Sequence, residues 1–194
     1  MDTADTTPLT YPDPMSTTLR VGFVPGVEPD RFARRWKGVP RGGRLQLVPV
    51  PVSRQRTALD DGDVDMCFVR LPVDESGLHV VALWEERASI VVGTENILSL
   101  HEELTEDLLA DETEIRSTEP DDAAQRVAVV VTGVGYTRMP LSVARTYHRR
   151  DAVVRPAPDR EPTRIALVWP REHDDALRQT FVGVVRGRTP RSSR

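Results

Sequence analysis

The chain has 194 residues, of which 39% are hydrophobic and 29% are charged, and its formal net charge at pH 7 is −4. This length allows one or two small domains with a real core, and the negative charge gives no general attraction to nucleic acid. No segment approaches the roughly 18–20 apolar residues that a membrane span needs. The acidic N-terminus lacks the features of a secretory signal, and there is one cysteine, so we expect a cytoplasmic protein without membrane contact.

Residues 1–18 are rich in Asp, Thr and Pro and are predicted to form a disordered tail, in which Met15 is an alternative start. The first predicted strand is Leu19–Val24. A helix is predicted over Pro29–Lys37, because Phe32 and Trp36 are four residues apart and share one face. The basic cluster in and after this helix lacks interleaved aromatic residues, and we interpret it as a solvated face rather than a nucleic-acid site. The cluster consists of Arg31, Arg34, Arg35, Lys37, Arg41 and Arg44.

The next segments predict a parallel βαβ arrangement. Leu45–Val52 is a predicted edge strand, because its two prolines cannot donate to a ladder. Ser53–Leu59 is a predicted short helix with Ser53 as its cap, and Gly62 provides the left-handed turn after it. Val64–Val69 is then a buried strand, in which Cys67 is a small core residue.

Further strands are predicted at His79–Leu83, Ser89–Gly93, Tyr136–Met139, Val153–Val154 and Ile165–Trp169. Further helices are predicted within Asn96–Leu109, where Asn96 and Thr105 are candidate caps, and over Leu141–Tyr147 and Asp174–Arg186. The residues 188–194 are expected to be a second disordered tail.

No catalytic or metal-binding motif is present. The four histidines lack metal-ligand spacing, and no HExxH, GxSxG or Walker pattern occurs. The acids Asp60, Asp61, Asp63 and Asp65 lack the later bidentate Glu of a calcium loop, so they are interpreted as turn residues. We therefore expect no enzyme activity, no metal and no cofactor.

Several motifs together resemble the effector-binding domain of LysR-type transcriptional regulators. They are LRVGFVPG at 19–26, LDDGDVDMCFVRLP at 59–72, GLHVVALWEE at 77–86, TGVGYTRMP at 132–140 and RIALVWPREHDDALRQTF at 164–181. The bias toward Arg, Val and Pro is similar to that of actinobacterial members. Only 18 residues precede Leu19, so the N-terminal helix-turn-helix of such regulators is expected to be absent.

The resemblance implies a two-lobed α/β fold of the periplasmic-binding-protein-like type 2 class, with parallel-rich sheets and flanking helices. Lobe I is expected to comprise residues 19–92 and 164–187, and lobe II residues 93–163, with crossovers near Gly93 and Thr163. It also implies that the valine-rich segment Ala123–Val134 is a helix, although β-propensity favours a strand. Lobe II is expected to be shortened, because much of the family's sequence between Glu112 and Gly133 is missing.

A two-lobed fold implies a ligand cleft between the lobes. Backbone amides after the turn Pro25-Gly26-Val27 and at Ser53 favour a small anion. Arg70, at a strand end, is a candidate bidentate ligand of a carboxylate, and a structural salt bridge from Arg70 to Asp65 or Glu85 is the alternative. Thr118 is the candidate on the lobe II side, and Tyr136 either covers the cleft or packs within lobe II.

The predicted function is that of a small-molecule sensing domain, and the molecule it senses is expected to be a small organic anion. The domain is expected to act in transcription regulation through conformational change or dimerisation. We expect a homodimer, or pairing with a full-length regulator, and no direct DNA binding. The alternatives are a vestigial interaction module with a closed cleft and a cytoplasmic solute-binding protein.

Overall fold

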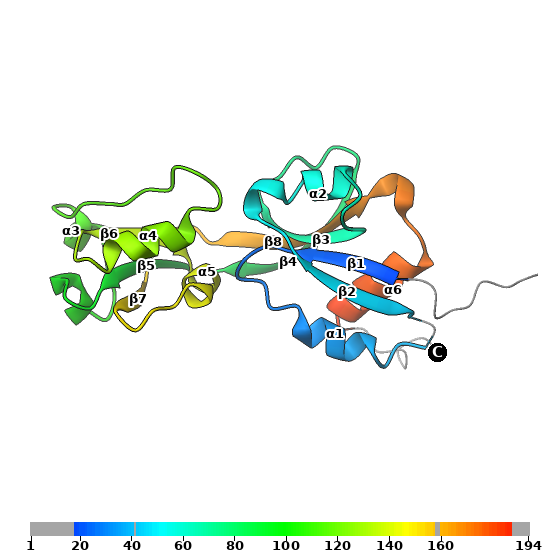
Figure 1. The fold of residues 1–194 in the computed structure, drawn as a ribbon, viewed down its shortest axis with the longest axis horizontal. Helices are drawn as coiled ribbons and strands as arrows, with labels where there is room; N and C mark the ends of the chain where they lie inside the picture. Colours follow the sequence, from blue (N-terminus) through cyan, green and yellow to red (C-terminus); the bar gives the residue numbers. More distant parts are fainter. Residues whose placement is uncertain (1–17, 41, 158–159, 188–194) are drawn as a thin grey trace, which may run out of the picture.

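Two β-sheets organise the chain, and they lie side by side along the long axis of the molecule (Figure 1). The computed structural model describes residues 18–40, 42–157 and 160–187. The two expected tails, apart from Thr18, and Arg41 of the basic cluster lie outside these residues. We call the five-stranded sheet with its helices lobe I and the three-stranded sheet with its helices lobe II.

Lobe I has the strand order β2-β1-β3-β8-β4. Its strands are β1 Thr18–Phe23, β2 Arg44–Pro49, β3 Met66–Leu71, β4 Leu78–Glu86 and β8 Thr163–Pro170. β1 is parallel to both β2 and β3, whereas β8 is antiparallel to β3 and β4. The predicted parallel arrangement and the edge position of the second strand are therefore confirmed.

Helices cover both faces of this sheet. Helices α1 (Asp30–Trp36) and α6 (Ala176–Val185) pack on one face, where Phe32, Phe68 and Phe181 form the centre of the core. The short helix α2 (Thr57–Asp60) covers the other face with Ala58 and Leu59. Cys67 is fully buried beneath α2, as predicted, and burial raises its pKa to about 12.

Lobe II has the strand order β6-β5-β7, and both pairs are antiparallel. Its strands are β5 Ala88–Gly93, β6 Tyr136–Pro140 and β7 Ala152–Pro156. Helices α4 (Ala123–Val130) and α5 (Leu141–Thr146) cover one face, and the turn η2 (Ile97–Leu100) with helix α3 (Glu106–Leu109) covers the other. The helix expected in the valine-rich segment is confirmed, because successive turns of α4 bury Ala123, Val127 and Val130 against the sheet.

Three local predictions were wrong. The segment expected as one helix from Ser53 forms a 3-10 turn η1 (Val52–Arg54) and then α2, and no side chain caps either. Thr105 makes no side-chain cap bond, although Asn96 accepts one from the Leu98 amide at 2.8 Å. The final helix predicted over Asp174–Arg186 is confirmed as α6, which follows a 3-10 turn η3 (Arg171–His173) and is capped by Asp175.

The third correction concerns the first crossover. The strand Ala88–Gly93 belongs to the lobe II sheet, so the chain leaves lobe I between Glu86 and Ala88 rather than near Gly93. The return crossover precedes β8, which begins at Thr163 as expected. A single residue, Arg87, joins β4 to β5, and the second crossover joins β7 to β8. The two crossovers together form the hinge between the lobes. Among the described residues, no helix is both long enough and apolar enough to cross a membrane.

Candidate functional site

The carboxylate of Glu86, at the end of β4, is the centre of the junction between the lobes. Arg70 donates to it from Nε at 2.6 Å and from Nη2 at 3.0 Å, and the Thr163 hydroxyl donates at 3.0 Å. The hydroxyl of Ser142, in the first turn of α5, donates a very short hydrogen bond to the same group. Residues of both crossovers and both lobes therefore meet on one side chain, which is only 2% exposed.

The hydrogen bonds determine the ionisation of Glu86. Burial alone would raise its pKa, but the donors Arg70, Ser142 and Thr163 outweigh burial and hold the pKa below its usual value. The carboxylate is therefore charged at neutral pH. Because the Arg70 guanidinium is 11% exposed, this is a nearly desolvated, bidentate ion pair.

The predicted turn of lobe I lies against the same junction. The Pro25 carbonyl accepts a hydrogen bond from Arg70 Nη2 at 2.8 Å, and Val27 is buried in the lobe I core. Gly26 has a φ of +93°, and a Cβ atom there would lie 2.6 Å from the Ser142 hydroxyl oxygen. The backbone of lobe I thus touches α5 of lobe II where a cleft was expected.

A second contact joins the lobes beside η1. Asp121, in the loop before α4, accepts hydrogen bonds from the Val52 amide at 2.7 Å and from the Ser53 amide at 3.3 Å. The amide that was expected to bind a ligand anion at Ser53 is thus paired with a carboxylate of the chain itself.

The other predicted site residues serve lobe II. The Thr118 amide donates to Asp122 at 2.8 Å, within the loop that carries Asp121. Tyr136 is buried at 4% exposure in the lobe II core, and its hydroxyl accepts a hydrogen bond from Arg138 at 3.2 Å. The structure therefore brings Pro25, Gly26 and Arg70 together, and keeps Tyr136 away from them.

Arg70 is found in a salt bridge, but both partners named for it from the sequence were wrong. Asp65 is paired with Arg20 and Glu85 with Arg164. The acids Asp60, Asp61 and Asp63 are paired with Arg54 and Arg56. Within the described part of the chain, no group of three or more His, Cys, Asp or Glu side chains is arranged to hold a metal ion.

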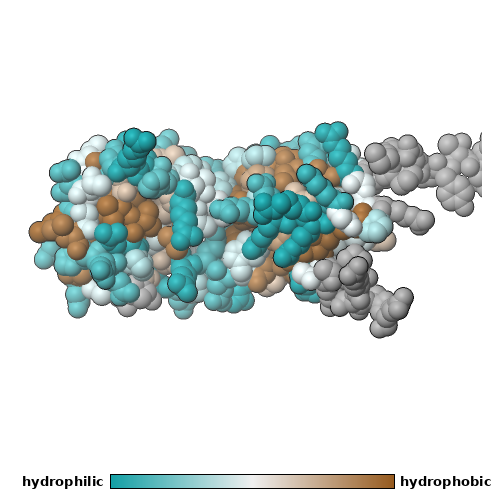
Figure 2. Space-filling model, turned by 90° about the horizontal axis from the view of Figure 1, so that it is seen from below, coloured by the Kyte–Doolittle hydropathy of each residue, from teal (hydrophilic) through white to brown (hydrophobic). Residues whose placement is uncertain are grey.

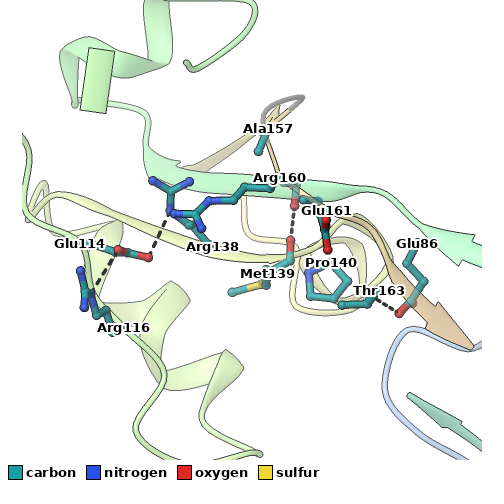
Figure 3. Close-up of a pocket in the computed structure, with 12 residues that line it drawn as sticks. Glu86, Glu114, Arg116, Arg138, Met139, Pro140, Ala157, Arg160, Glu161 and Thr163 are labelled. Atoms are coloured by element: carbon teal, nitrogen blue, oxygen red, sulfur yellow. Dashed lines mark hydrogen bonds and ion pairs between the residues drawn. The ribbon is translucent and has the colours of Figure 1, made fainter. Parts of the chain in front are cut away.

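A cavity of about 550 Å³ opens beside the junction, and we call it the hinge cavity (Figure 3). Glu86 and Thr163 lie at one end of it, and Met139, Pro140 and Ala157 contribute an apolar wall. Three guanidiniums lie toward the other end, with Glu114 between two of them. They belong to Arg116, Arg138 and Arg160.

Ion pairs hold that basic end in place. Arg138 donates to both oxygens of Glu106 at 2.8 and 3.0 Å, and its Nε lies 3.2 Å from Glu114. Arg160 also pairs with Glu106, and Arg116 pairs with Glu114. Two carboxylates are therefore shared by three guanidiniums, which leaves one excess positive charge. Glu161, an exposed acid of the same cavity, has no ion-pair partner among the described residues.

A larger hollow of about 910 Å³ lies along β7 and α5. Its cations include Arg87 and Arg145, and its apolar lining includes Leu141 and Val154. None of the seven site residues predicted from the sequence lines this hollow or the hinge cavity.

Sequence reasoning missed Glu86, Ser142 and Asp121 as junction residues. Glu86 was within reach, because it ends the quoted motif GLHVVALWEE and follows an apolar strand. Ser142 follows the Pro140 that ends another quoted motif. Nothing in the sequence distinguishes Asp121 from the other acids of its loop, because its role depends on a contact between residues 69 positions apart.

The chain resembles known proteins both in sequence and in fold. The family model described as LysR substrate binding domain matches residues 12–127, and a comparison with curated proteins gave no match. The BenM effector-binding domain with its effector benzoate superposes with a TM-score of 0.69 at 18% identity, over 90% of this chain and 96% of that chain. The reduced OxyR regulatory domain from Pseudomonas aeruginosa gives 0.68 at 17% identity, over 91% and 98%.

A full-length BenM mutant superposes with a TM-score of 0.71 at 18% identity, over 89% of this chain and 67% of that chain. At these identities the solved structures establish the fold, and the sequence match establishes the family. The resemblance seen in the motifs is thereby confirmed. The chain belongs to the LysR substrate-binding domain family, and its α/β fold is the periplasmic-binding-protein-like type 2 fold of LysR-type effector-binding domains.

Proposed function

We propose that this chain is a sensing domain for a small organic anion and that it acts in transcription regulation without a catalytic step. The hinge cavity is the observation that carries the proposal, since it lies beside both crossovers and its volume suits a small ligand. Family membership and the benzoate-bound BenM domain support the same class of ligand.

The lining of the cavity suggests how such an anion would lie. Its carboxylate would meet the guanidiniums of Arg116 and Arg160 at the basic end, where one positive charge is in excess. Its apolar body would pack on Met139 and Pro140. Because Glu161 has no ion-pair partner among the described residues, its negative charge disfavours a ligand with a second anionic group.

The ligand would be coupled to the hinge through Glu86 and Thr163. Both residues line the cavity, and both belong to the hydrogen-bonded junction that fixes the lobes. A ligand with different contacts in the open and closed arrangements would shift the lobe angle, or the packing of a dimer. The ligand-binding role predicted from the sequence for seven residues stays a prediction. These residues are Pro25, Gly26, Val27, Ser53, Arg70, Thr118 and Tyr136.

A thermal-shift screen of aliphatic and aromatic carboxylates, benzoate included, tests the proposal. Ligand at about 100 times its dissociation constant stabilises the fold by about 2.7 kcal/mol, which raises the melting temperature by roughly 5–10 °C for a chain of this size. Arg116→Ala should abolish the shift with little effect on the unliganded melt, because its side chain is 80% exposed.

Two further variants locate the site. Arg164→Ala is the matched control, because Arg164 is an exposed, acid-paired arginine outside the cavity, and it should keep the full shift. Arg145→Ala removes a cation of the larger hollow. If Arg145→Ala abolishes the shift and Arg116→Ala does not, the larger hollow is the site. A screen without any stabilising acid would contradict the sensing function itself.

The closed cleft favours one rival function, a vestigial interaction or dimerisation module. Ser142 and Asp121 of lobe II occupy the positions that were expected to meet a ligand. In that case the lobes would move as one body and no organic acid would stabilise the chain. A protein with this rival function would still pair with a second copy.

Pairing is part of the proposal for both functions. The exposed edge strand β2 lies beside α1, and apolar surface is visible on this side of lobe I (Figure 2). We infer a homodimer, or pairing with a full-length regulator in the cytoplasm, and no direct DNA binding by this chain. Sedimentation that shows only monomer at tens of micromolar would contradict pairing, and a salt-resistant nanomolar gel shift would contradict the absence of DNA binding.

A further inference from the structure

Asp121 is the only charged group of the loop before α4 that contacts lobe I among the described residues. Its two oxygens accept the amides of Val52 and Ser53, so the contact is charge-assisted and two-pronged. The side chain is otherwise exposed, and its loop joins no strand of lobe I. Neither the ion pairs of lobe II nor its core explains why this carboxylate reaches across to the other lobe.

The next residue, Asp122, fixes the loop that presents Asp121. Asp122 is buried, and it accepts the amides of Thr118 at 2.8 Å and Glu119 at 3.3 Å. Arg126 holds the same carboxylate from α4 at 2.7 Å and reaches the Thr137 hydroxyl on β6. The loop is thereby tied to the lobe II sheet, and any movement of lobe II carries Asp121 with it.

The only other side-chain bridge between the lobes that we find in the described residues is Ser142 to Glu86. It lies directly on the crossovers, where a hinge rotation moves atoms least. Asp121 instead binds η1, which belongs to neither crossover, so its contact must break for the lobes to separate. A contact at a distance from the hinge controls the lobe angle more strongly than one on the hinge.

We propose that Asp121 is a built-in carboxylate latch that holds lobe II closed on lobe I in the unliganded chain. It supplies from within the chain the negative charge that the free amides of η1 would otherwise take from solution. Because the carboxylate is tethered, its effective concentration at the amides is on the order of millimolar or higher, and dilute free anions do not displace it. The inference concerns the unliganded chain, so it holds whether or not the proposed effector exists.

The latch is tested by measuring the distance between the lobes in the full chain. Spin labels on Thr57→Cys in α2 and Gln125→Cys in α4 report this distance, because both positions are exposed and lie on opposite lobes. The native Cys67 is fully buried and stays unlabelled. Asp121→Ala removes the latch. Glu119→Ala is the matched control, since it removes an exposed acid of the same loop whose side chain makes no hydrogen bond or ion pair with the described residues.

The expected result is a longer or broader distance distribution for Asp121→Ala and an unchanged one for Glu119→Ala. Amide hydrogen exchange gives an independent readout. The Val52 amide should exchange about tenfold faster in Asp121→Ala, since loss of one such hydrogen bond corresponds to about 1.4 kcal/mol. If the distance distribution of Asp121→Ala superimposes on that of the parent, the latch is refuted, even where organic acids stabilise the chain. An open Asp121→Ala variant that no acid stabilises would refute the sensing function and keep the latch.

Discussion

Replacing Arg70 by Ala tests whether this residue is structural or binds ligand. In the folded chain its guanidinium makes two bonds to Glu86 and one to the Pro25 carbonyl. The substitution leaves the Glu86 carboxylate in place with an exposed fraction of 2% and without its cation. The remaining donors, Ser142 and Thr163, are neutral hydroxyls, and they do not balance a buried charge.

The magnitude follows from the burial of the pair. Removing one member of a buried ion pair costs about 3–5 kcal/mol, because the other charge is left uncompensated. At about 2–4 °C per kcal/mol for a chain of this size, the melting temperature should fall by roughly 6–20 °C. The matched control is Arg164→Ala, which breaks the neighbouring exposed pair with Glu85 and should cost less than about 1 kcal/mol.

Urea unfolding of Arg70→Ala, Glu86→Gln and the double variant measures this coupling. In the Glu86→Gln background the acceptor is neutral, so Arg70→Ala should cost at least about 1 kcal/mol less than in the parent. An unliganded melt of Arg70→Ala within a degree or two of the parent would refute the structural role. If that variant also lost a carboxylate-induced shift, Arg70 would be a ligand-binding residue after all.

Three further predictions concern ionisation, backbone conformation and the loop of lobe II. The pKa values of Asp65, Glu86 and Asp122 lie below their usual range, because hydrogen bonds from Arg20, Arg70 and Thr118 respectively, with others, outweigh the effect of burial. Their stabilisation is therefore complete above the unfolded pKa of about 4 and is lost as the pH falls through the lower folded values, which pH-dependent urea unfolding measures. Gly135→Ala should cost several kcal/mol of stability or prevent folding, because a Cβ atom there would lie 1.8 Å from the Thr113 carbonyl oxygen. Gly133→Ala is the control. A Cβ atom at Gly133 would meet no other atom within 4 Å, so this substitution should cost only about 1 kcal/mol for its positive φ. Asp122→Ala should destabilise the chain by about 2–4 kcal/mol in the same assay, because it leaves buried Arg126 without its carboxylate.

The elements of lobe I were predictable because local and tertiary preferences agree there. Val64–Val69 is apolar except for Asp65, and the corresponding strand β3 is buried on both faces in the middle of the sheet. Gly62 was expected in a left-handed turn, and its φ is +70°. Phe32 and Trp36 share the buried face of α1 because the helical period places them together. In such segments one pattern dictates both the element and its buried face.

The candidate site was less predictable because its contacts join residues far apart in the chain. Arg70 was recognised as a strand-end cation, but its partner Glu86 depends on how β4 runs beside β8 and into the crossover. The sequence offered several acids at comparable positions, and only the sheet register distinguishes Glu86, which faces inward, from Glu85, which faces solvent. A one-residue difference along a strand reverses the face, so Glu85 was the wrong partner, whereas Asp65 was wrong because it pairs with Arg20.

The composition of the junction bears on the choice between a sensor and a vestigial module. The four apolar clusters of the described residues each lie within one lobe, two in lobe I and two in lobe II, and none spans the cleft. What joins the lobes across the cleft is polar: the Ser142 hydroxyl on Glu86 and the Asp121 carboxylate on two amides. Such bonds exchange with water at little net cost, whereas a shared apolar core does not. A cleft closed in this way can reopen, which a sensing domain requires and a fused module does not.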